Sequence, residues 1–428
     1  MPADGSREHS IDIPMREFNI SVLKICTENL YISNKVCAEV AVDKNVMSAC
    51  EEYWLLFANE ERHFVWRVEC LTQRFTYSGA GVDRKLRAES KRALGVLRET
   101  FRFCPYGRVV RLPFGNIFPF HDWFLDLVIE EIGTKVFIAQ LAGKYDTIAI
   151  DGIAMAVNDV IRSGARPLAI ADNIHEQVAD PALIREWMKG VVRGAVQAEC
   201  IVPSGEIGDV AELIKGVVEG KGFDMVFASI GEVAKQKVIS GRGIKPGDVI
   251  IGLRSSGVHS NGISLVRRIL FKQWGGKYEA DAVPDGLDRE LVMEVLEPTT
   301  IYVKPLLRIA EEVKVKAAVH ITGDAYLKFE KLARFSKGIG FVFDNFRPQP
   351  IFDLVQKTAK QLGGLISDEE MFKTFNMGWG FAVILDKASA EGAVGVLEKT
   401  GVHSERIGQV TGQVGVKIVH KGKKIVLK

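Results

Sequence analysis

The spacing of apolar residues divides the chain into segments of different kinds. Short apolar runs at residues 146–151, 166–172 and 200–206 (DTIAID, RPLAIAD and CIVPSGE) predict strands. Between them, residues 152–165 and 181–199 carry apolar side chains at every third or fourth position, which predicts helices. Because strands that alternate with helices are typical of α/β proteins, we expect this fold class.

A polar, glycine-marked stretch at residues 234–248 (AKQKVISGRGIKPGD) interrupts the alternation. Such stretches are common between domains, so we place a boundary near Gln236. Beyond it the pattern predicts helices at 263–270, 351–362 and 388–400, and strands at 249–253, 338–344, 380–386, 406–410, 414–420 and 423–428. We therefore expect two domains of mixed α/β type, at residues 76–235 and 236–428.

The first 75 residues differ from the rest, since they hold four of the six cysteines and no glycine-rich loop. Residues 46–71 (VMSACEEYWLLFANEERHFVWRVECL) carry apolar side chains at helical spacing. One interpretation is a helical appendage. The other is that the coding start was placed too early, because the interpretable sequence begins near Tyr77. Both stay open.

The composition excludes several classes of protein. A chain of 428 residues with 47% hydrophobic and 26% charged residues is typical of a globular protein with two cores. A net charge of +2 gives no overall attraction to nucleic acid or to an anionic membrane. No apolar stretch approaches the roughly 20 residues that span a bilayer, and the N-terminus lacks the apolar core of a signal peptide, so we expect a cytoplasmic protein. The six cysteines form no CxxC pair, which predicts reduced, buried thiols.

Eight segments together resemble the aminoimidazole ribonucleotide synthetase family, also called phosphoribosylformylglycinamidine cyclo-ligases. Residues 245–270 (KPGDVIIGLRSSGVHSNGISLVRRIL) are the most specific of them. The others are YSGAGVD at 77–83, EEIGTK at 130–135, KYDTIAIDGIAMAVND at 144–159, SGE at 204–206, EPTTIYVKPLL at 297–307, HITG at 320–323 and EEMFKTFNMGWG at 369–380. One such motif would be weak, but so many in the family's order are a strong signal.

The resemblance implies both a fold and a reaction. Each half is expected to be an α/β domain, and the N-terminal halves of two subunits are expected to pair strands into a shared β-barrel, which makes a homodimer. The reaction implied is the ATP-dependent closure of formylglycinamidine ribonucleotide to aminoimidazole ribonucleotide, with Mg²⁺ as the metal. ATP phosphorylates the formyl oxygen, an amidine nitrogen attacks, and phosphate leaves.

Three acidic residues are the candidate ligands of that Mg²⁺, which prefers carboxylate and phosphate oxygens. Glu130 takes the place of a family aspartate, and Asp151 lies where the predicted strand ends and a helix begins. Asp159 follows about two helical turns later, so the sequence predicts that one metal ion is reached from both ends of this segment. A plain helix cap is the alternative role for Asp151.

Other polar residues match family positions near the nucleotide or the substrate. Lys135 resembles the lysine that reaches the ATP phosphates, although most lysines are simply exposed. The glycines of the loop at 255–262 would let backbone N–H groups approach a phosphate, and the dipole of the following helix points at the same place. His259 in this loop is the candidate for moving the proton lost during ring closure, or else fixes the loop by hydrogen bonding. The further candidate binding residues are Gly133, Thr134, Asn158, Asp172, Glu206, Ser255, Ser256, Gly257, Ser260, Asn261, Gly262, His320 and Thr322. The alternative for His320 and Thr322 is that they only cap the helix that follows. The alternative for Asp172 and Glu206 is that they support a neighbouring binding residue without touching the ligand.

The sequence departs from the family pattern at glycines. Glu131 stands where the family has glycine, and Asp324 and Ala325 replace the glycines after HITG. The Gly-Gly-Glu-Thr loop has become residues 204–207 (SGEI). These changes keep two alternatives open: a kinase-like or dehydratase-like relative that phosphorylates another small molecule, and a catalytically silent nucleotide-binding protein.

Overall fold

The computed structural model describes residues 53–59, 62–68 and 73–427. It separates into two units, Met1–Gln73 and Arg74–Lys428. In the first unit, β1 (Tyr53–Asn59) and β2 (Arg62–Val68) form an antiparallel pair. The expected helix is therefore wrong for these two segments. Their sequences, YWLLFAN and RHFVWRV, are rich in aromatic and β-branched residues, which favour strands over helices.

Several predictions for the N-terminal region lie outside the described residues. These include the rest of the helix predicted at 46–71, and the cysteines Cys26, Cys37, Cys50 and Cys70. Of the described cysteines, Cys104 and Cys200 are free and half-buried.

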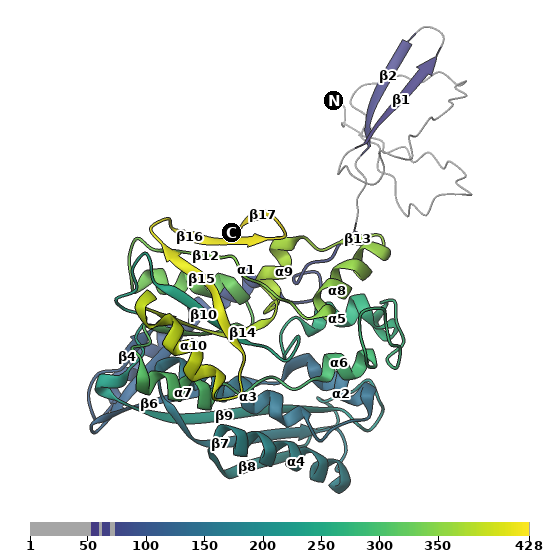
Figure 1. The fold of residues 1–428 in the computed structure, drawn as a ribbon. Coiled ribbons are helices and arrows are strands. Elements are labelled where there is room, and N and C mark those ends of the chain that lie inside the picture. The colour runs from purple at the N-terminus through teal and green to yellow at the C-terminus, as the bar shows by residue number, and fades with distance from the viewer. Residues whose placement is uncertain (1–52, 60–61, 69–72, 428) are drawn as a thin grey trace, which may run out of the picture. The chain divides into compact units, whose positions relative to one another are not determined.

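A six-stranded sheet forms the lower layer of the second unit (Figure 1). Its order is β4-β5-β6-β9-β7-β8, and all neighbours are antiparallel except β7 and β8. The strands are β4 (Val110–Leu112), β5 (Gly115–Phe120), β6 (Trp123–Glu131), β7 (Arg166–Glu176), β8 (Ile201–Asp209) and β9 (Phe223–Ala234). This sheet is open, with β4 and β8 as its edges.

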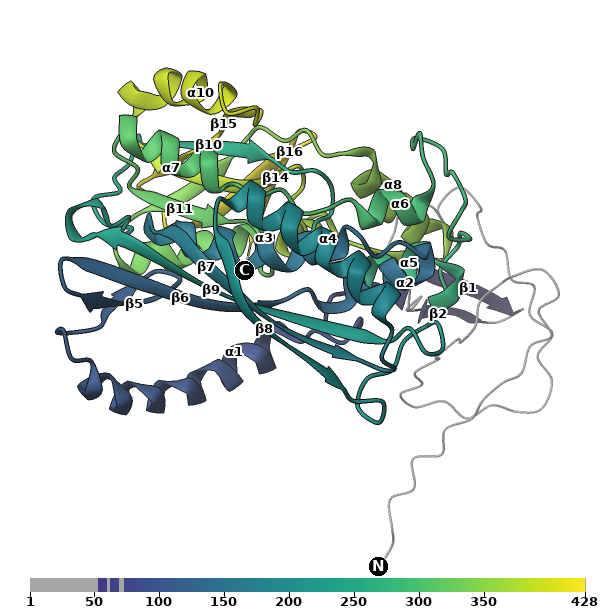
Figure 2. The ribbon, with the colours of Figure 1, turned by 90° about the horizontal axis from the view of Figure 1, so that it is seen from below.

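Helices α3 (Ile148–Val160) and α4 (Pro181–Ala198) lie side by side against this sheet (Figures 1 and 2). The strand predicted at 146–151 is wrong, because α3 already begins at Ile148 and holds Asp151 in its first turn. All 13 residues of α3 are buried. A helix that is apolar on every side shows no 3.6-residue period, so its first turn could not be told from a short buried strand.

A seven-stranded sheet forms the upper layer, in the order β11-β14-β10-β15-β12-β16-β17. Only β12 and β16 are parallel neighbours. The strands are β10 (Val249–Arg254), β11 (Ala317–His320), β12 (Gly340–Phe343), β14 (Trp379–Leu385), β15 (Ser404–Thr411), β16 (Gly415–His420) and β17 (Lys423–Leu427). The helices of this half are α5 (Ile263–Leu270), α6 (Leu291–Leu296), α7 (Val303–Glu312), α8 (Pro350–Gln361), α9 (Asp368–Thr374) and α10 (Ala390–Glu398). The elements predicted beyond residue 248 are thus confirmed, apart from shifts of a few residues at their ends.

The remaining α-helices and strands of the described residues are α1 (Arg84–Ala93), α2 (Val136–Ala142), β3 (Gln73–Arg74) and β13 (Gly364–Leu365). None of the described helices is both long and apolar enough to cross a membrane. The last strand of the six-stranded sheet ends at Ala234, and the first strand of the seven-stranded sheet begins at Val249. All residues from Arg74 onward nevertheless form one compact unit. The domain boundary near Gln236 therefore stays a prediction.

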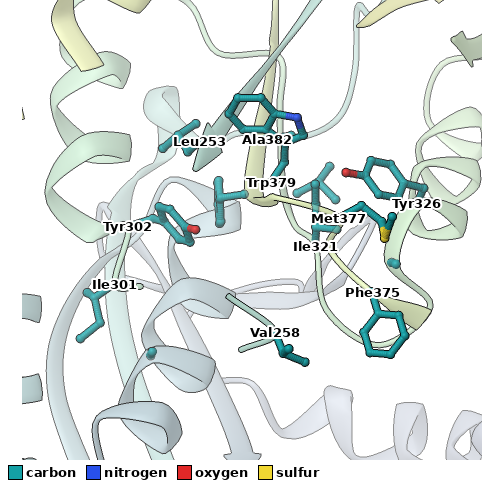
Figure 3. Packing of buried hydrophobic residues seen from close by; sticks show 14 of the residues in the cluster. Leu253, Val258, Ile301, Tyr302, Ile321, Tyr326, Phe375, Met377, Trp379 and Ala382 are labelled. Carbon is teal, nitrogen blue, oxygen red and sulfur yellow. The ribbon is translucent and has the colours of Figure 1, made fainter. Parts of the chain in front are cut away.

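The buried core holds the loop at residues 255–262 in place (Figure 3). Tyr302 and Trp379 are fully buried, and the Tyr302 hydroxyl donates to the Arg254 carbonyl at 2.7 Å. Gly262 has a φ of +78°, and a Cβ there would lie 2.3 Å from the Phe375 ring. Because only glycine fits this left-handed, crowded position, the sequence fixes how the loop enters α5.

Candidate active site

Helix α3 carries candidate acidic residues at both of its ends. Asp151 is in its first turn and Asp159 is its penultimate residue. At 1.5 Å of rise per residue, these two positions are about 12 Å apart along the helix axis. Mg²⁺ binds oxygens at about 2.1 Å, so one ion does not reach both. The predicted single metal site with ligands from both ends is therefore wrong, and the candidates form two groups.

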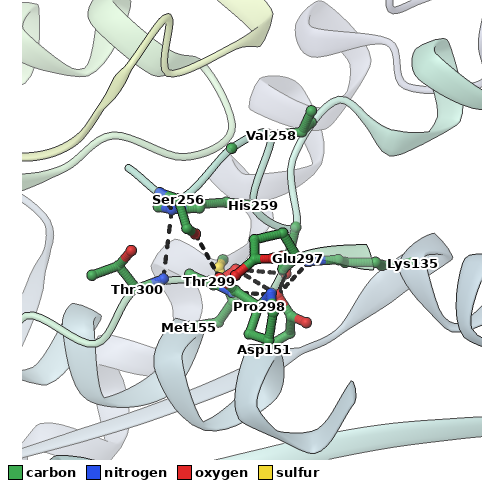
Figure 4. A network of polar contacts seen from close by, with 12 residues as sticks. Lys135, Asp151, Met155, Ser256, Val258, His259, Glu297, Pro298, Thr299 and Thr300 are labelled. Atoms are coloured by element: carbon green, nitrogen blue, oxygen red, sulfur yellow. Dashed lines mark hydrogen bonds and ion pairs between the residues drawn. The ribbon is translucent and has the colours of Figure 1, made fainter. Parts of the chain in front are cut away.

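The first group is a buried ion pair between Lys135 and Asp151 (Figure 4). Both side chains have 0% exposure, and Lys135 Nζ lies 2.8 Å from Asp151 Oδ1. The same ammonium donates to the Glu297 carbonyl at 2.6 Å. Asp151 Oδ1 also accepts from the Ser260 hydroxyl and from both the backbone and the hydroxyl of Thr299. Lys135 is thus not the exposed lysine of the alternative interpretation.

The second carboxylate oxygen of Asp151 is buried and has no hydrogen-bond partner within the described protein. A buried carboxylate oxygen without a partner is costly, so it marks a position where a ligand or an ion is expected. Thr134 and Gly133 lie in the turn just before Lys135. Thr134 is 3.2 Å from the Ser264 hydroxyl, and Gly133 has a φ of +73°.

The hydroxyls of the loop at 255–262 are bound mostly within the protein. Ser255 donates to Asn376 at 3.0 Å, Ser256 donates to the Pro298 carbonyl at 2.5 Å, and Ser260 donates to Asp151. The Gly257 carbonyl accepts from the Asn376 side-chain amide at 2.8 Å. The loop is therefore fixed in place by its own side chains rather than offering several free donors.

His259 is deeply buried, with a φ of +61°. Its Nε2 accepts from the backbone N–H of Ser256 at 3.1 Å and of Thr300 at 3.5 Å. Burial, with the neighbouring charge of Lys135, holds the pKa of His259 well below its usual value. A neutral imidazole that accepts two backbone hydrogen bonds supports the loop-fixing role more than the proton-moving role.

The second group lines a cavity of about 340 Å³ beyond the other end of α3. Its acidic residues are Asp126 and Glu130 from β6, Asp159 from α3 and Asp324. Asn261 and Met155 lie between the two groups, since both line the cavity and the Asn261 amide contacts the Met155 sulfur at 3.9 Å. The basic lining residues are Arg87, Lys91, Arg162, Lys328 and Lys331.

Asp159 is the most strongly paired acid of the cavity. It lies 2.8 Å from His320 Nδ1 and 2.6 Å from the Arg162 guanidinium. Although burial opposes it, the charge of Arg162 and the hydrogen bond from His320 hold the pKa of Asp159 well below its usual value. Burial lowers the pKa of His320 to about 4. His320 is therefore a neutral donor to Asp159 at neutral pH.

Two further groups titrate close to neutral pH. Burial, together with the charge of Asp159, raises the pKa of Glu130 to about 7. Burial lowers the pKa of Lys328 to about 8, and this ammonium donates to the His320 carbonyl at 3.0 Å and contacts the Thr322 hydroxyl. Perturbed acids and bases that share one cavity are typical of an active site.

The other predicted residues lie apart from the cavity. Asn158 bonds the Thr300 carbonyl at 2.8 Å and the Tyr302 N–H at 2.8 Å, so it holds the segment after Thr299. Asp172 is half-buried on β7 against Gly205, where a Cβ would come within 2.1 Å of its carboxylate. Glu206 is exposed on the edge strand β8. The structure does not bring Asp172 or Glu206 to the described cavity.

Sequence analysis missed Asp126, Arg162 and Lys328. Arg162 follows Asp159 by three residues, and this helical spacing was a usable signal for the ion pair. Lys328 comes from an irregular 3₁₀ segment at 325–334 that reaches the cavity only through tertiary packing. No pattern in the chain marks it.

Asp126 predicts a pH-dependent stability change. Burial raises its pKa to about 6 from an ordinary value of 3.8. The folded state then binds the proton more tightly than the unfolded state, so the free energy of unfolding falls as pH rises from about 4 to about 6. Above pH 6 the carboxyl is ionised in both states, and the full loss of stability persists. We expect Asp126→Asn to be more stable than the parent by about 2 kcal/mol at pH 8 and nearly equal at pH 4.

Urea unfolding at pH 4 and pH 8 checks this expectation. Asp122→Asn, in the exposed turn beside β6, is the matched control and should change stability little at either pH. An Asp126→Asn difference of the same size at both pH values would contradict the raised pKa.

Comparisons with known proteins show the family to which the chain is similar. Residues 123–233 match the N-terminal domain, and residues 245–421 the C-terminal domain, of the family described as AIR synthase related protein. A phosphoribosylformylglycinamidine cyclo-ligase of Thermococcus gammatolerans is 35% identical over 355 residues, covering 82% of this chain and 99% of that protein. Proteins of the same name from Methanocaldococcus jannaschii and Bacillus cytotoxicus are 36% and 37% identical, covering 82% and 71% of this chain and 95% and 86% of their own lengths.

Solved structures are more distant. The hydrogenase maturation protein HypE of E. coli aligns with 71% of this chain and 85% of its own, at 16% identity and a TM-score of 0.49. This likeness is too weak to carry a functional conclusion.

Proposed function

The chain belongs to the AIR synthase related family of phosphoribosylformylglycinamidine cyclo-ligases, and from this premise we propose that it closes the imidazole ring of aminoimidazole ribonucleotide. It is an enzyme of this family with a role in purine biosynthesis. The observation that carries the specific reaction is the pair of sites at the ends of α3: a buried lysine–carboxylate pair at one end and a cavity with both acids and bases at the other.

The reaction needs ATP and formylglycinamidine ribonucleotide side by side. The terminal phosphoryl group of ATP moves to the formyl oxygen, so an O–P bond forms and ADP leaves. An amidine nitrogen then attacks the formyl carbon, a C–N bond forms, the C–O bond breaks, and phosphate departs with the former formyl oxygen. The chemistry thus requires cationic groups for the phosphoryl oxygens and a water-poor place for the attack.

We assign the two ends of α3 to these two requirements. Lys135 is the cation that offsets charge on the transferred phosphoryl group, and Asp151 positions it. The cavity lined by Asn261 and Thr322 takes the formylglycinamidine part of the substrate. His320, which is neutral, holds Asp159 by a 2.8 Å hydrogen bond.

The residues also fit a magnesium ion. Mg²⁺ is usually held by one or two carboxylates, while phosphate oxygens and waters complete its coordination. Glu130 and Asp159 line the same cavity, and the raised pKa of Glu130 reflects burial beside the charge of Asp159, which a cation would relieve. Among the described residues there is no cluster of three such ligands, so waters and oxygens of the bound substrates would complete the coordination. Glu130 and Asp159 would hold the ion, which would supply positive charge that stabilises the charge developing during phosphoryl transfer.

The direct test of the reaction class is turnover of formylglycinamidine ribonucleotide with ATP and magnesium. The proposal expects aminoimidazole ribonucleotide, detected as its diazo dye, in equal amounts to ADP. ADP without this product would instead favour a relative that phosphorylates another small molecule.

We also propose that the enzyme is a homodimer built on the six-stranded sheet. Along β6 alternate residues lie on opposite faces, so Asp126 and Glu130 share one face while Leu127 and Ile129, which are 59% and 69% exposed, share the other. Leu127 also contributes to the lining of the cavity. Phe120 and Trp123 continue this exposed apolar face. Contiguous apolar surface of this kind marks an interface, and a second copy of the same face, with edge strands free to pair, gives the expected shared barrel.

Charge on this face should separate the subunits. Leu127→Lys with Ile129→Lys places four buried charges in a two-fold interface, and we expect the dimer to weaken by at least about 10³-fold. Val192→Lys with Val196→Lys is the matched control, since these valines of α4 are similarly exposed at 61% and 68%. Sedimentation equilibrium measures both. A parent protein that is already a monomer, or an equal loss in the control, would contradict this interface.

A further inference from the structure

Three basic side chains at the cavity lack acidic partners. Arg87 and Lys91 come from α1, and Lys331 comes from the segment at 325–334. Within the part of the chain that the structure describes, none of the three has a carboxylate within ion-pair distance. Burial, partly offset by Asp324, lowers the pKa of Lys331, and the charges of Lys91 and Arg162 lower it further. Like charges are thus gathered at one place, which is unfavourable unless an anion joins them.

Helix α1 is held so that this basic face meets the cavity. Arg87 and Lys91 are four residues apart and therefore share one side of the helix. Asp83 caps the helix by accepting from the Lys85 and Leu86 N–H groups at 2.8 and 3.0 Å. Arg84 fixes the same end by bonds to Glu370 at 3.0 Å and to the Thr374 hydroxyl at 2.6 Å. The position of the two basic side chains is therefore built into the fold.

The acidic and basic lining residues come mostly from different elements. Asp126, Glu130 and Asp159 are on β6 and α3, whereas Arg87, Lys91, Lys328 and Lys331 are on α1 and the 325–334 segment. The exceptions are Arg162, which pairs with Asp159, and Asp324, which lies near Arg84. A ligand with one anionic end is oriented by such a division, because its anion is attracted to the basic side and repelled from the acidic side.

We propose that Arg87, Lys91 and Lys331 bind the phosphomonoester of the ribonucleotide substrate. This inference rests on the proposed ring-closing function. Lys135, assigned to the ATP phosphates, pairs with Asp151, which lies about 12 Å along the α3 axis from Asp159 of the cavity. The three basic residues therefore anchor the end of the substrate that does not react, and their binding energy places the formyl group near the nucleotide. Since ATP also carries phosphates, the test must separate the two sources.

The test is steady-state kinetics of the double variant Arg87→Gln/Lys331→Gln in the full chain. Loss of two charge-assisted contacts should raise the KM for the ribonucleotide by about 30-fold or more, with the KM for ATP changed by less than about 2-fold. The variants should fold, because α1 has no buried residue. Lys85→Gln is the matched control, since Lys85 is an exposed residue of α1 that does not line the cavity. Inorganic phosphate should compete with the ribonucleotide in the parent and less so in the double variant.

Two other kinetic outcomes overturn the inference. A raised KM for ATP would assign the site to the nucleotide, and unchanged constants for both substrates would show that no phosphate binds there. If the parent makes no aminoimidazole ribonucleotide, the proposed function fails. Binding of ribose 5-phosphate, measured by calorimetry, then tests the anion site by itself, and equal binding by parent and double variant would overturn it.

Discussion

Replacing Lys135 by methionine is expected to lower turnover by about 10³-fold or more, because the cation that offsets charge on the transferred phosphoryl group is lost. The same change should destabilise the protein, since it leaves Asp151 ionised and fully buried without its ion-pair partner. Breaking a buried pair in this way costs about 3–5 kcal/mol. A loss of activity alone would therefore not separate chemistry from folding.

A second substitution separates the two effects. Asp151→Asn keeps an oxygen that accepts from Ser260 and Thr299 but removes the buried charge. The double variant Lys135→Met/Asp151→Asn should regain much of the lost stability while turnover stays about 10³-fold low. Denaturant unfolding and kcat, measured on the parent, both single variants and the double variant, give the complete cycle.

Lys316 provides a matched control for a buried lysine. Its ammonium lies 2.8 Å from Asp248 and 2.7 Å from Asp386, and it does not line the cavity. Lys316→Met should destabilise the protein to a similar extent and leave kcat of the folded enzyme nearly unchanged. If Lys135→Met keeps the kcat of the parent, or if Lys316→Met loses as much turnover, Lys135 has no role in the phosphoryl transfer.

Asp159→Asn is expected to lower kcat by about 10²–10³-fold and to raise the magnesium concentration needed for half-maximal activity. The amide keeps the size of the side chain but removes the charge that faces Arg162 and that is offered to a metal ion. Loss of this charge also relieves Glu130, whose pKa is raised by burial and by Asp159, so the pKa of Glu130 should fall. Activity titrated with magnesium measures the effect.

Asp172→Asn is the control for this prediction. Asp172 matches an acidic family position in sequence, yet the structure places it on β7 beside Gly205, away from the described cavity. Its substitution should change kcat by less than about 3-fold. A larger loss in Asp172→Asn than in Asp159→Asn would show that the sequence match, and not the cavity, locates the metal.

The sequence predicted best those elements that have one apolar and one polar side. Helix α5 begins and ends at the predicted residues, because Ile263, Leu265, Val266, Ile269 and Leu270 are buried while the polar residues between them are more exposed. Helix α3 was misread at its start because it has no polar exposed side. Periodicity carries information only where an element lies between core and solvent.

The candidate site was predicted in part for a related reason. Lys135, Asp151 and Asp159 lie in motifs, so the resemblance located them. Their partners did not follow from the motifs, because the 297–300 segment reaches Asp151 across 148 residues of sequence and His320 reaches Asp159 across 161. The burial of His259 also could not be predicted from the sequence. Because burial lowers its pKa, His259 is a neutral acceptor of backbone hydrogen bonds rather than the expected base.

The central claim is that ATP activates the formyl oxygen of the substrate for ring closure. Its most direct test uses formylglycinamidine ribonucleotide labelled with ¹⁸O in the formyl group, turned over with ATP and magnesium, with mass spectrometry of the released phosphate. The account predicts one ¹⁸O atom in each phosphate, formed together with one aminoimidazole ribonucleotide. Unlabelled phosphate, with the ¹⁸O retained in the substrate or released to water, would contradict it.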